Sequence, residues 1–253
     1  MLTFSEAQIG ALYGAVFWPL ARVLALFATA PIFSHPSLGV RVRVALALAI
    51  SLLLAPQVAT PPIDRLAGTA GLLALAQDMM VGLVLGFTVR LVFAAIEFAG
   101  EMMGLQIGLS FAGFFNPTSS QSQTPISTFL SLVATLMFLS IDGHLQLLQA
   151  LAETFRAFPI GADGIPLSAE QVARMGSRMF SLGLSIALPF IAVALLTSIL
   201  LGILSRVAPQ LNLFGIGFPL TLTSGLTVLA LLMPYLEKPL RTALEGAVGF
   251  WLR

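Results

Sequence analysis

Long apolar segments, separated by short polar ones, run through the whole chain. The apolar segments are residues 9–33, 44–59, 66–107, 126–158, 179–204 and 211–236. A helix that crosses a membrane needs about 20 consecutive apolar residues, and most of these segments are that long. The pattern therefore predicts an all-α, multi-helix integral membrane protein, with about six apolar helical regions in a single membrane-embedded domain over residues 1–253.

Several of these regions do not have the length or regularity of a simple span. Region 44–59 has only a short apolar run before Pro56, whereas region 66–107 is so long that we expect it to hold two helical pieces. Pro189 and Pro219 lie inside the last two regions, and a proline inside a helix removes a hydrogen bond and bends or breaks it. The connector between these two regions, residues 205–210, is short. We therefore expect long, bent or broken helical hairpins.

Composition supports the membrane class and excludes others. Apolar residues make up 58% of the chain and charged residues 9%, and the mean hydropathy is +0.99. Soluble domains carry about 25% charged residues. The absence of cysteine excludes disulfides and thiolate metal sites. A net charge of +1 gives no electrostatic basis for binding nucleic acid. The N-terminus has neither a basic region nor a cleavage pattern, so we expect the first span to be retained.

Charged residues in or beside the apolar regions are candidate functional sites. Arg90, Glu97 and Glu101 lie in region 66–107, and Arg206 lies in the last connector. An ionised side chain in mid-membrane costs about 2.5–3.5 kcal/mol, so it normally faces protein or water. Arg90 leans away from Glu97, because side chains tilt toward the helix N-terminus. We expect structural ion pairs with other helices or other chains; the alternatives are a proton or ion relay, or a segment outside membrane depth.

Glycines recur at four-residue spacing near the end of the same region. Gly100, Gly104 and Gly108 share one helix face, and Gly82 and Gly86 repeat the spacing upstream. In lipid, small residues at this spacing let another backbone approach closely. The ladder predicts helix packing, either within the chain or against a partner subunit.

An aromatic segment follows the glycines. Residues 108–117 combine glycines and phenylalanines with a helix-ending Asn-Pro, and irregular backbone in hydrocarbon must be buried in protein or line a cavity. A hydrophobic constriction uses such residues. The segment is therefore either a plug or gate loop, or a helix end buried by its neighbours. The candidate plug residues are Gly108, Ser110, Phe111, Gly113, Phe114, Phe115, Asn116 and Pro117.

Enzyme chemistry finds no support in the sequence. His35 and His144 lie in separate loops without a second ligand at metal spacing. There is no Gly-x-Ser-x-Gly nucleophile elbow and no glycine-rich phosphate loop with a lysine. We expect no catalytic residue, no metal and no cofactor.

Four sequence segments resemble the FliR family of flagellar-type protein export-gate subunits. They occur in the family's order and extend over nearly the whole chain. They are Phe17–Pro31, Gly100–Ala112 followed by Asn116-Pro117, Gly143-His144-Leu145 and Arg206–Gly225. The string Arg206–Gly225 is the most specific of them. The family also contains the equivalent subunit of virulence injectisomes, which this chain resembles less.

The resemblance implies a subunit of the type III export gate in the bacterial inner membrane, at the flagellar basal body. It implies assembly with FliP-like and FliQ-like membrane subunits, and contact with FlhB-like and FlhA-like components. Together these would form a closed channel for unfolded flagellar proteins. Part of the apolar mass would lie on the periplasmic side of the bilayer, buried between subunits, and residues 108–117 would contribute to the plug. The alternatives are the injectisome homologue or, in a different class, a secondary transporter or small-molecule channel, which would be expected to show inverted repeats.

Overall fold

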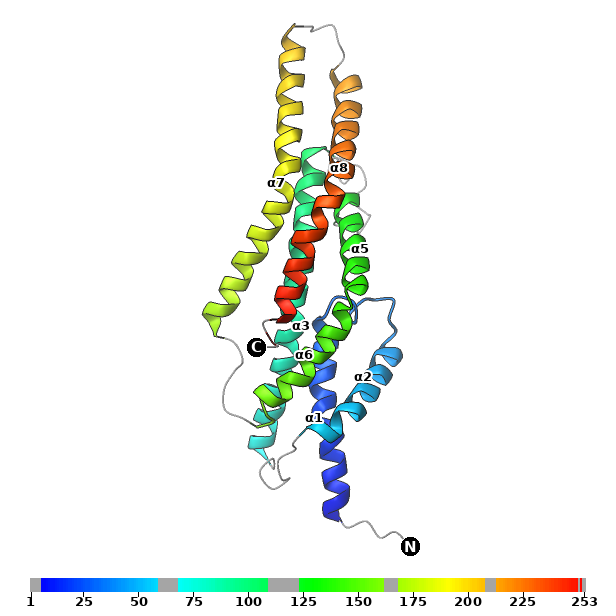
Figure 1. The fold of residues 1–253 in the computed structure, drawn as a ribbon, viewed down its shortest axis with the longest axis vertical. Coiled ribbons are helices and arrows are strands. Elements are labelled where there is room, and N and C mark those ends of the chain that lie inside the picture. Colours follow the sequence, from blue (N-terminus) through cyan, green and yellow to red (C-terminus); the bar gives the residue numbers. More distant parts are fainter. Residues whose placement is uncertain are drawn as a thin grey trace. The chain divides into compact units, whose positions relative to one another are not determined.

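The computed structural model describes residues 6–58, 68–108, 123–161, 168–207, 213–249 and 251, and these residues form helices and short connections without a strand (Figure 1). The helices are α1 (Glu6–Thr29), α2 (Val40–Leu54), the 3-10 helix η1 (Ala55–Gln57), α3 (Thr69–Gln106), α5 (Pro125–Ser140), α6 (Gly143–Ala157), α7 (Ala169–Val207) and α8 (Leu213–Gly249). The predicted all-α membrane class is confirmed.

The candidate membrane spans can be identified among the described residues. Four helical stretches of the described residues are long and apolar enough to cross a membrane: Val40–Gln57, Thr69–Gln106, Glu170–Val207 and Gly217–Gly249. A fifth span results if α5 and α6 together form one broken span. The segment Gly14–Thr29 of α1 is also apolar.

The prediction that region 66–107 holds two helical pieces is wrong, because α3 is one continuous helix of 38 residues. The segment contains no proline, and its glycines lie where other helices pack against it. By contrast, region 126–158 is broken at Asp142, which adopts a left-handed conformation with φ of 55°. Asp and Asn tolerate this conformation better than most residues, and Gly143 follows as the first residue of α6.

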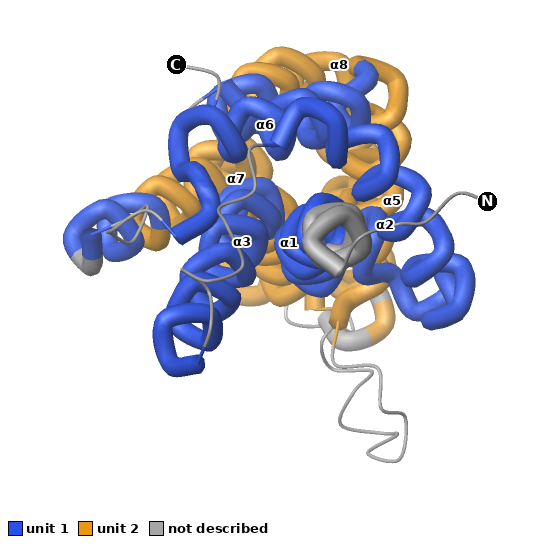
Figure 2. Tube along the Cα trace, turned by 90° about the horizontal axis from the view of Figure 1, so that it is seen from below, with its two compact units in different colours: residues 1–91, 142–175, 244–253 blue, residues 92–141, 176–243 orange. Residues whose placement is uncertain are grey.

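The chain divides into two compact units (Figure 2). Unit 1 contains residues 1–91, 142–175 and 244–253, and unit 2 contains residues 92–141 and 176–243. Helices α3, α7 and α8 each contribute residues to both units. Neither unit is a continuous stretch of sequence, and the single membrane domain stays a prediction.

In unit 1, α1 packs closely against the first half of α3. Gly82 lies against Arg22 and Ala25, and Gly86 lies against Leu26 and Thr29. The later residue of α3 contacts the later residue of α1, so the two helices run parallel here. The hydroxyl of Thr29 donates a hydrogen bond across the contact to the Leu83 carbonyl oxygen at 3.2 Å. The glycines allow this approach, since any Cβ would meet the backbone of α1.

In unit 2, the second half of α3 packs against α5 and α7. Gly100 lies against Ser127 and Gly104 against Thr124, both in or at the start of α5. The numbers run in opposite directions, so α3 and α5 form an antiparallel hairpin. Gly183 of α7 lies against Ala95, where an added Cβ would come 2.6 Å from the Ala95 carbonyl oxygen.

The α1–α3 contact predicts a sharp difference between two glycines. A Cβ at Gly86 would lie 2.9 Å from the Leu26 carbonyl oxygen and 3.0 Å from the Ala30 nitrogen, and a helix backbone cannot move aside as a side chain does. We expect Gly86→Ala to lower stability by about 1–3 kcal/mol through overpacking. Thermal unfolding of the purified protein in detergent, followed by circular dichroism, measures the change.

The matched control is Gly176→Ala in α7, where an added Cβ has no atom within 4 Å. Removing a helical glycine there should be neutral or stabilising, by up to about 1 kcal/mol. Equal melting temperatures for Gly86→Ala and the wild-type protein would contradict the close packing of α1 on α3.

Candidate functional site

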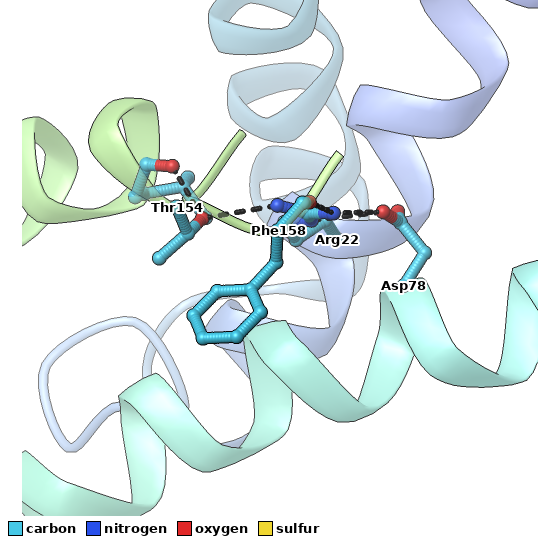
Figure 3. A network of polar contacts seen from close by, with 5 residues as sticks. Arg22, Asp78, Thr154 and Phe158 are labelled. Atoms are coloured by element: carbon cyan, nitrogen blue, oxygen red, sulfur yellow. Dashed lines mark hydrogen bonds and ion pairs between the residues drawn. The ribbon is translucent and has the colours of Figure 1, made fainter. Parts of the chain in front are cut away.

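A buried ion pair joins α1 and α3 in unit 1. Arg22 and Asp78 are 1% and 2% exposed, and Arg22 is the largest of the fully buried side chains in the described part of the chain. Its Nε donates a hydrogen bond to Asp78 Oδ1 at 2.9 Å, and Nη2 also donates to this oxygen (Figure 3). A charge this deep is stable only when it is paired and hydrogen-bonded.

The rest of the guanidinium group bonds to α6 and the residue after it. Nη1 donates to Thr154 Oγ1 at 3.2 Å, and Nη2 donates to the Phe158 carbonyl oxygen at 2.9 Å (Figure 3). The Phe155 ring lies 4.0 Å from Arg22 Cζ, a distance that gives a cation–π contact. One arginine therefore ties α1, α3 and α6 together, and all of these residues belong to unit 1.

This network holds helices in position. Both charged side chains are about 1% exposed, so neither reaches the water that a proton relay would need. Removing one partner of a buried pair leaves an unpaired charge, which costs about 3–5 kcal/mol. This pair was not predicted from the sequence. Each of two apolar regions contains a charged residue, and the two charges are of opposite sign, which could have suggested a pair. However, 56 residues separate them in the sequence.

The acidic residues predicted to lie in α3 bond to the start of α5. The backbone N–H of Thr124 donates to Glu101 Oε1 at 2.7 Å. Ser131 Oγ donates to Glu97 Oε1 at 3.4 Å, and Ser127 Oγ donates to the Glu97 carbonyl oxygen at 3.0 Å. These carboxylates therefore accept hydrogen bonds from backbone and hydroxyl groups of α5.

The two predicted basic residues lie on the surface. Arg90 in α3 and Arg206 in the last turn of α7 are exposed. The ion pairs Arg22–Asp78, Arg156–Glu153 and Arg174–Glu170 of the described residues include neither of the two. Arg90 and Arg206 are not brought together with Glu97 and Glu101.

The end of α3 and the start of α5 form the base of the predicted plug loop. At the end of α3, Gly108 has a φ of +80° and its N–H donates to the Leu105 carbonyl oxygen at 3.1 Å. At the start of α5, the Thr124 hydroxyl caps the helix by accepting from the Ser127 N–H at 3.3 Å, and Pro125 occupies the first helical position. Glycine suits the positive φ, and threonine followed by proline is a favoured helix start.

Two contacts fasten this base. The first is the hydrogen bond from Thr124 to Glu101, and the second is the close packing of Thr124 on Gly104, where an added Cβ would lie 2.7 Å from Thr124 Oγ1. The candidate plug residues Ser110, Phe111, Gly113, Phe114, Phe115, Asn116 and Pro117 lie outside the described residues. Gly108 is the part of the predicted loop that the structure describes.

Groups of three or more His, Cys, Asp or Glu side chains that could hold a metal ion do not occur among the described residues. The Arg22 network and the base of the hairpin are two polar clusters of the described residues. Both are built to hold helices together.

Comparisons with known proteins agree over nearly the full chain. The sequence profile of the family described as bacterial export proteins, family 1, matches residues 13–247. The flagellar biosynthetic protein FliR of Pectobacterium carotovorum is 44% identical over 92% of this chain and 90% of that protein. FliR of Escherichia coli is 42% identical over the same shares, and FliR of Buchnera aphidicola from Acyrthosiphon pisum is 36% identical over 99% and 97%.

The buried pair predicts strong coupling between two positions. Arg22→Met or Asp78→Leu alone leaves one charge unpaired in the core, and we expect each to lose about 3–5 kcal/mol of stability. The double variant removes both charges and should recover much of that loss. Unfolding in detergent of the two single variants and the double variant gives the coupling energy.

An exposed ion pair provides the comparison. Arg156→Ala removes the partner of Glu153, whose pair is 72% and 39% exposed, and should cost no more than about 1 kcal/mol. If the losses at Arg22 and Asp78 simply added in the double variant, the two residues would not act as a buried pair.

Proposed function

The chain belongs to the FliR family of bacterial export proteins, and on that premise we propose that it is a membrane subunit of the flagellar type III protein export gate. The family consists of structural components of the export apparatus, and the chain is not an enzyme. Its matched relatives are named as flagellar biosynthetic proteins, which favours the flagellar branch over the injectisome branch.

In this proposal the chain assembles with FliP-like and FliQ-like subunits into a closed channel through which unfolded flagellar proteins leave the cytoplasm. FlhB-like and FlhA-like components are the further partners. The amount of apolar surface supports an assembly. In the most apolar stretches of α7 and α8, only 17% of the residues are buried within the chain, whereas 56% are buried in the corresponding stretch of α3. Such faces need lipid or other subunits to cover them.

Helix length supports a position only partly within the bilayer of the bacterial inner membrane. Helices α3, α7 and α8 have 38, 39 and 37 residues. At ~1.5 Å per residue each is roughly 55–60 Å long, whereas the hydrocarbon core is roughly 30 Å thick. Part of each helix therefore extends beyond the hydrocarbon or is strongly tilted. We propose that the part beyond it lies on the periplasmic side, buried between subunits.

The loop between α3 and α5 is proposed to form part of the plug that closes the channel. The observation that supports this is the fastened base: Glu101 holds the Thr124 backbone, and Gly104 lets Thr124 pack against α3. These contacts join the two helices without involving residues 109–122. Phe111, Phe114 and Phe115 supply the apolar side chains that a seal against ions requires.

The assembly is tested by purifying the tagged chain, co-expressed with its genomic neighbours, in mild detergent and analysing it by native mass spectrometry. We expect a defined complex with two other kinds of small membrane subunit. A stable, monodisperse monomer that has no partner would contradict the gate proposal, and flux into liposomes containing this chain alone would favour a transporter.

The plug predicts that deleting residues 110–115 raises ion leakage through the assembled complex severalfold, because the three phenylalanines are removed. Conductance of complexes in planar bilayers measures this, and native mass spectrometry verifies that assembly persists. The matched control deletes Ser119–Gln121, a polar part of the same loop, and should leak far less. A tight ion barrier in the assembled 110–115 deletion would contradict the plug.

A further inference from the structure

One face of α3 in unit 1 is exposed and apolar, except for a single cation. Leu72, Met80 and Phe87 on this face are 68%, 41% and 37% exposed, and Arg90 follows one turn after Phe87. The opposite face carries Asp78 and packs against α1. The spacing of these residues places the exposed ones in a continuous stripe.

Arg90 lies in a long, mainly apolar stretch of α3 between Asp78 and Glu97. Between Asp78 and Glu97 it is the single charged residue in the sequence Met79–Ile96. Those 18 residues correspond to about 27 Å of helix, close to the thickness of the hydrocarbon core. Facing lipid there, an arginine would cost about 2.5–3.5 kcal/mol.

The Arg90 side chain is not directed toward the nearer end of this apolar stretch. Eleven apolar or small residues precede Arg90 within it and six follow. A helical side chain leans toward the helix N-terminus, so Arg90 is directed along the longer apolar side. This lean also takes it away from Glu97.

The acidic groups of α3 already have partners on other helices of the chain. Asp78 binds Arg22, and the Glu97 and Glu101 carboxylates accept hydrogen bonds from Ser131 and Thr124. No ion pair of the part of the chain that the structure describes involves Arg90. These described contacts therefore leave Arg90 able to pair with a group outside them.

We propose that Arg90 binds a carboxylate on a membrane helix of a partner subunit, which packs along the Leu72–Met80–Phe87 face of α3. A guanidinium group offers a planar fork of donors that matches a carboxylate, and this pairing is strong where water is excluded. The apolar residues on both sides of Arg90 supply that exclusion. The inference builds on the proposed function, since it takes the partner to be another membrane subunit of the same assembly.

The test compares charge variants of Arg90 in the co-expressed complex. We expect Arg90→Gln to lower the partner recovered per chain severalfold, Arg90→Glu to lower it further, and Arg90→Lys to retain most of it. The control is Arg174→Gln, which removes an exposed arginine paired with Glu170 and should leave recovery unchanged. Each variant is first shown to fold by its circular dichroism and its yield.

A photo-crosslinking residue in place of Phe87 then identifies the partner chain and the segment that it contacts. The expected segment is an apolar helix with one aspartate or glutamate. Exchanging the charges, with Arg90→Glu in this chain and arginine at the partner's acidic position, should restore recovery. Failure of this exchange to restore binding would overturn the proposal.

The absence of cysteine allows a clean test of the environment of Arg90. In the assembled complex, Arg90→Cys should be protected from a membrane-impermeant thiol reagent. Rapid labelling would place the residue in water, and crosslinks from position 87 to lipid alone would place it against the bilayer. Either result, or full recovery of partners by Arg90→Gln, would overturn the inference, while a defined wild-type complex would still support the proposed function.

Discussion

The buried pair of Arg22 and Asp78 is the interaction on which unit 1 depends. An arginine in the middle of an apolar helix must have its charge and its donors satisfied, and here one guanidinium group uses Asp78, Thr154 and the Phe158 carbonyl oxygen to do so. Because these acceptors come from α3, from α6 and from the residue after α6, the arginine fixes the positions of three segments at once. Apolar packing alone would allow the helices to slide or rotate. The charge therefore contributes specificity to a contact surface made mainly of small and apolar side chains.

Close backbone approach is the second constraint, and it follows the same logic in both units. Lipid offers no hydrophobic drive for helices to associate, so dispersion and hydrogen bonds between nearby backbones must supply it. Glycines in α3 serve this purpose at Gly82, Gly86, Gly100 and Gly104, each with a polar or small residue opposite. The same approach lets hydroxyl groups reach carbonyl oxygens on the neighbouring helix, as Thr29 does with Leu83 and Ser127 does with Glu97. Small residues thus allow both close packing of the helices and hydrogen bonds between them.

Much of the fold could be predicted from local patterns, and the remainder depends on contacts that local patterns do not contain. Apolar runs, prolines and short connectors predicted the helical membrane class, whereas the break at Asp142 divides a region that was expected to be one apolar segment, residues 126–158. The continuity of α3 was missed because its length exceeds a bilayer, and length alone suggested a division. The partners of Arg22, and those of Glu97 and Glu101, could not be derived, since pairing across 23 to 136 residues is set by tertiary packing. The plug segment after Gly108 stays a prediction from sequence and family.

Hydropathy indicates that a residue is unfavourable in water, but it does not show whether lipid or a neighbouring subunit covers that residue. Helix α3 shows how charge resolves that ambiguity where apolar residues cannot. On its inner face, the charge of Asp78 is compensated within the chain by Arg22. On its outer face, Arg90 has the same chemical requirement among equally apolar neighbours, yet the ion pairs of the described residues do not include it. A lipid-facing surface would gain nothing from such a residue and would lose stability through it, whereas a surface that another helix covers would gain specificity, as α1 does from Arg22. The outer face of α3 is therefore better understood as half of an interface than as a surface exposed to lipid.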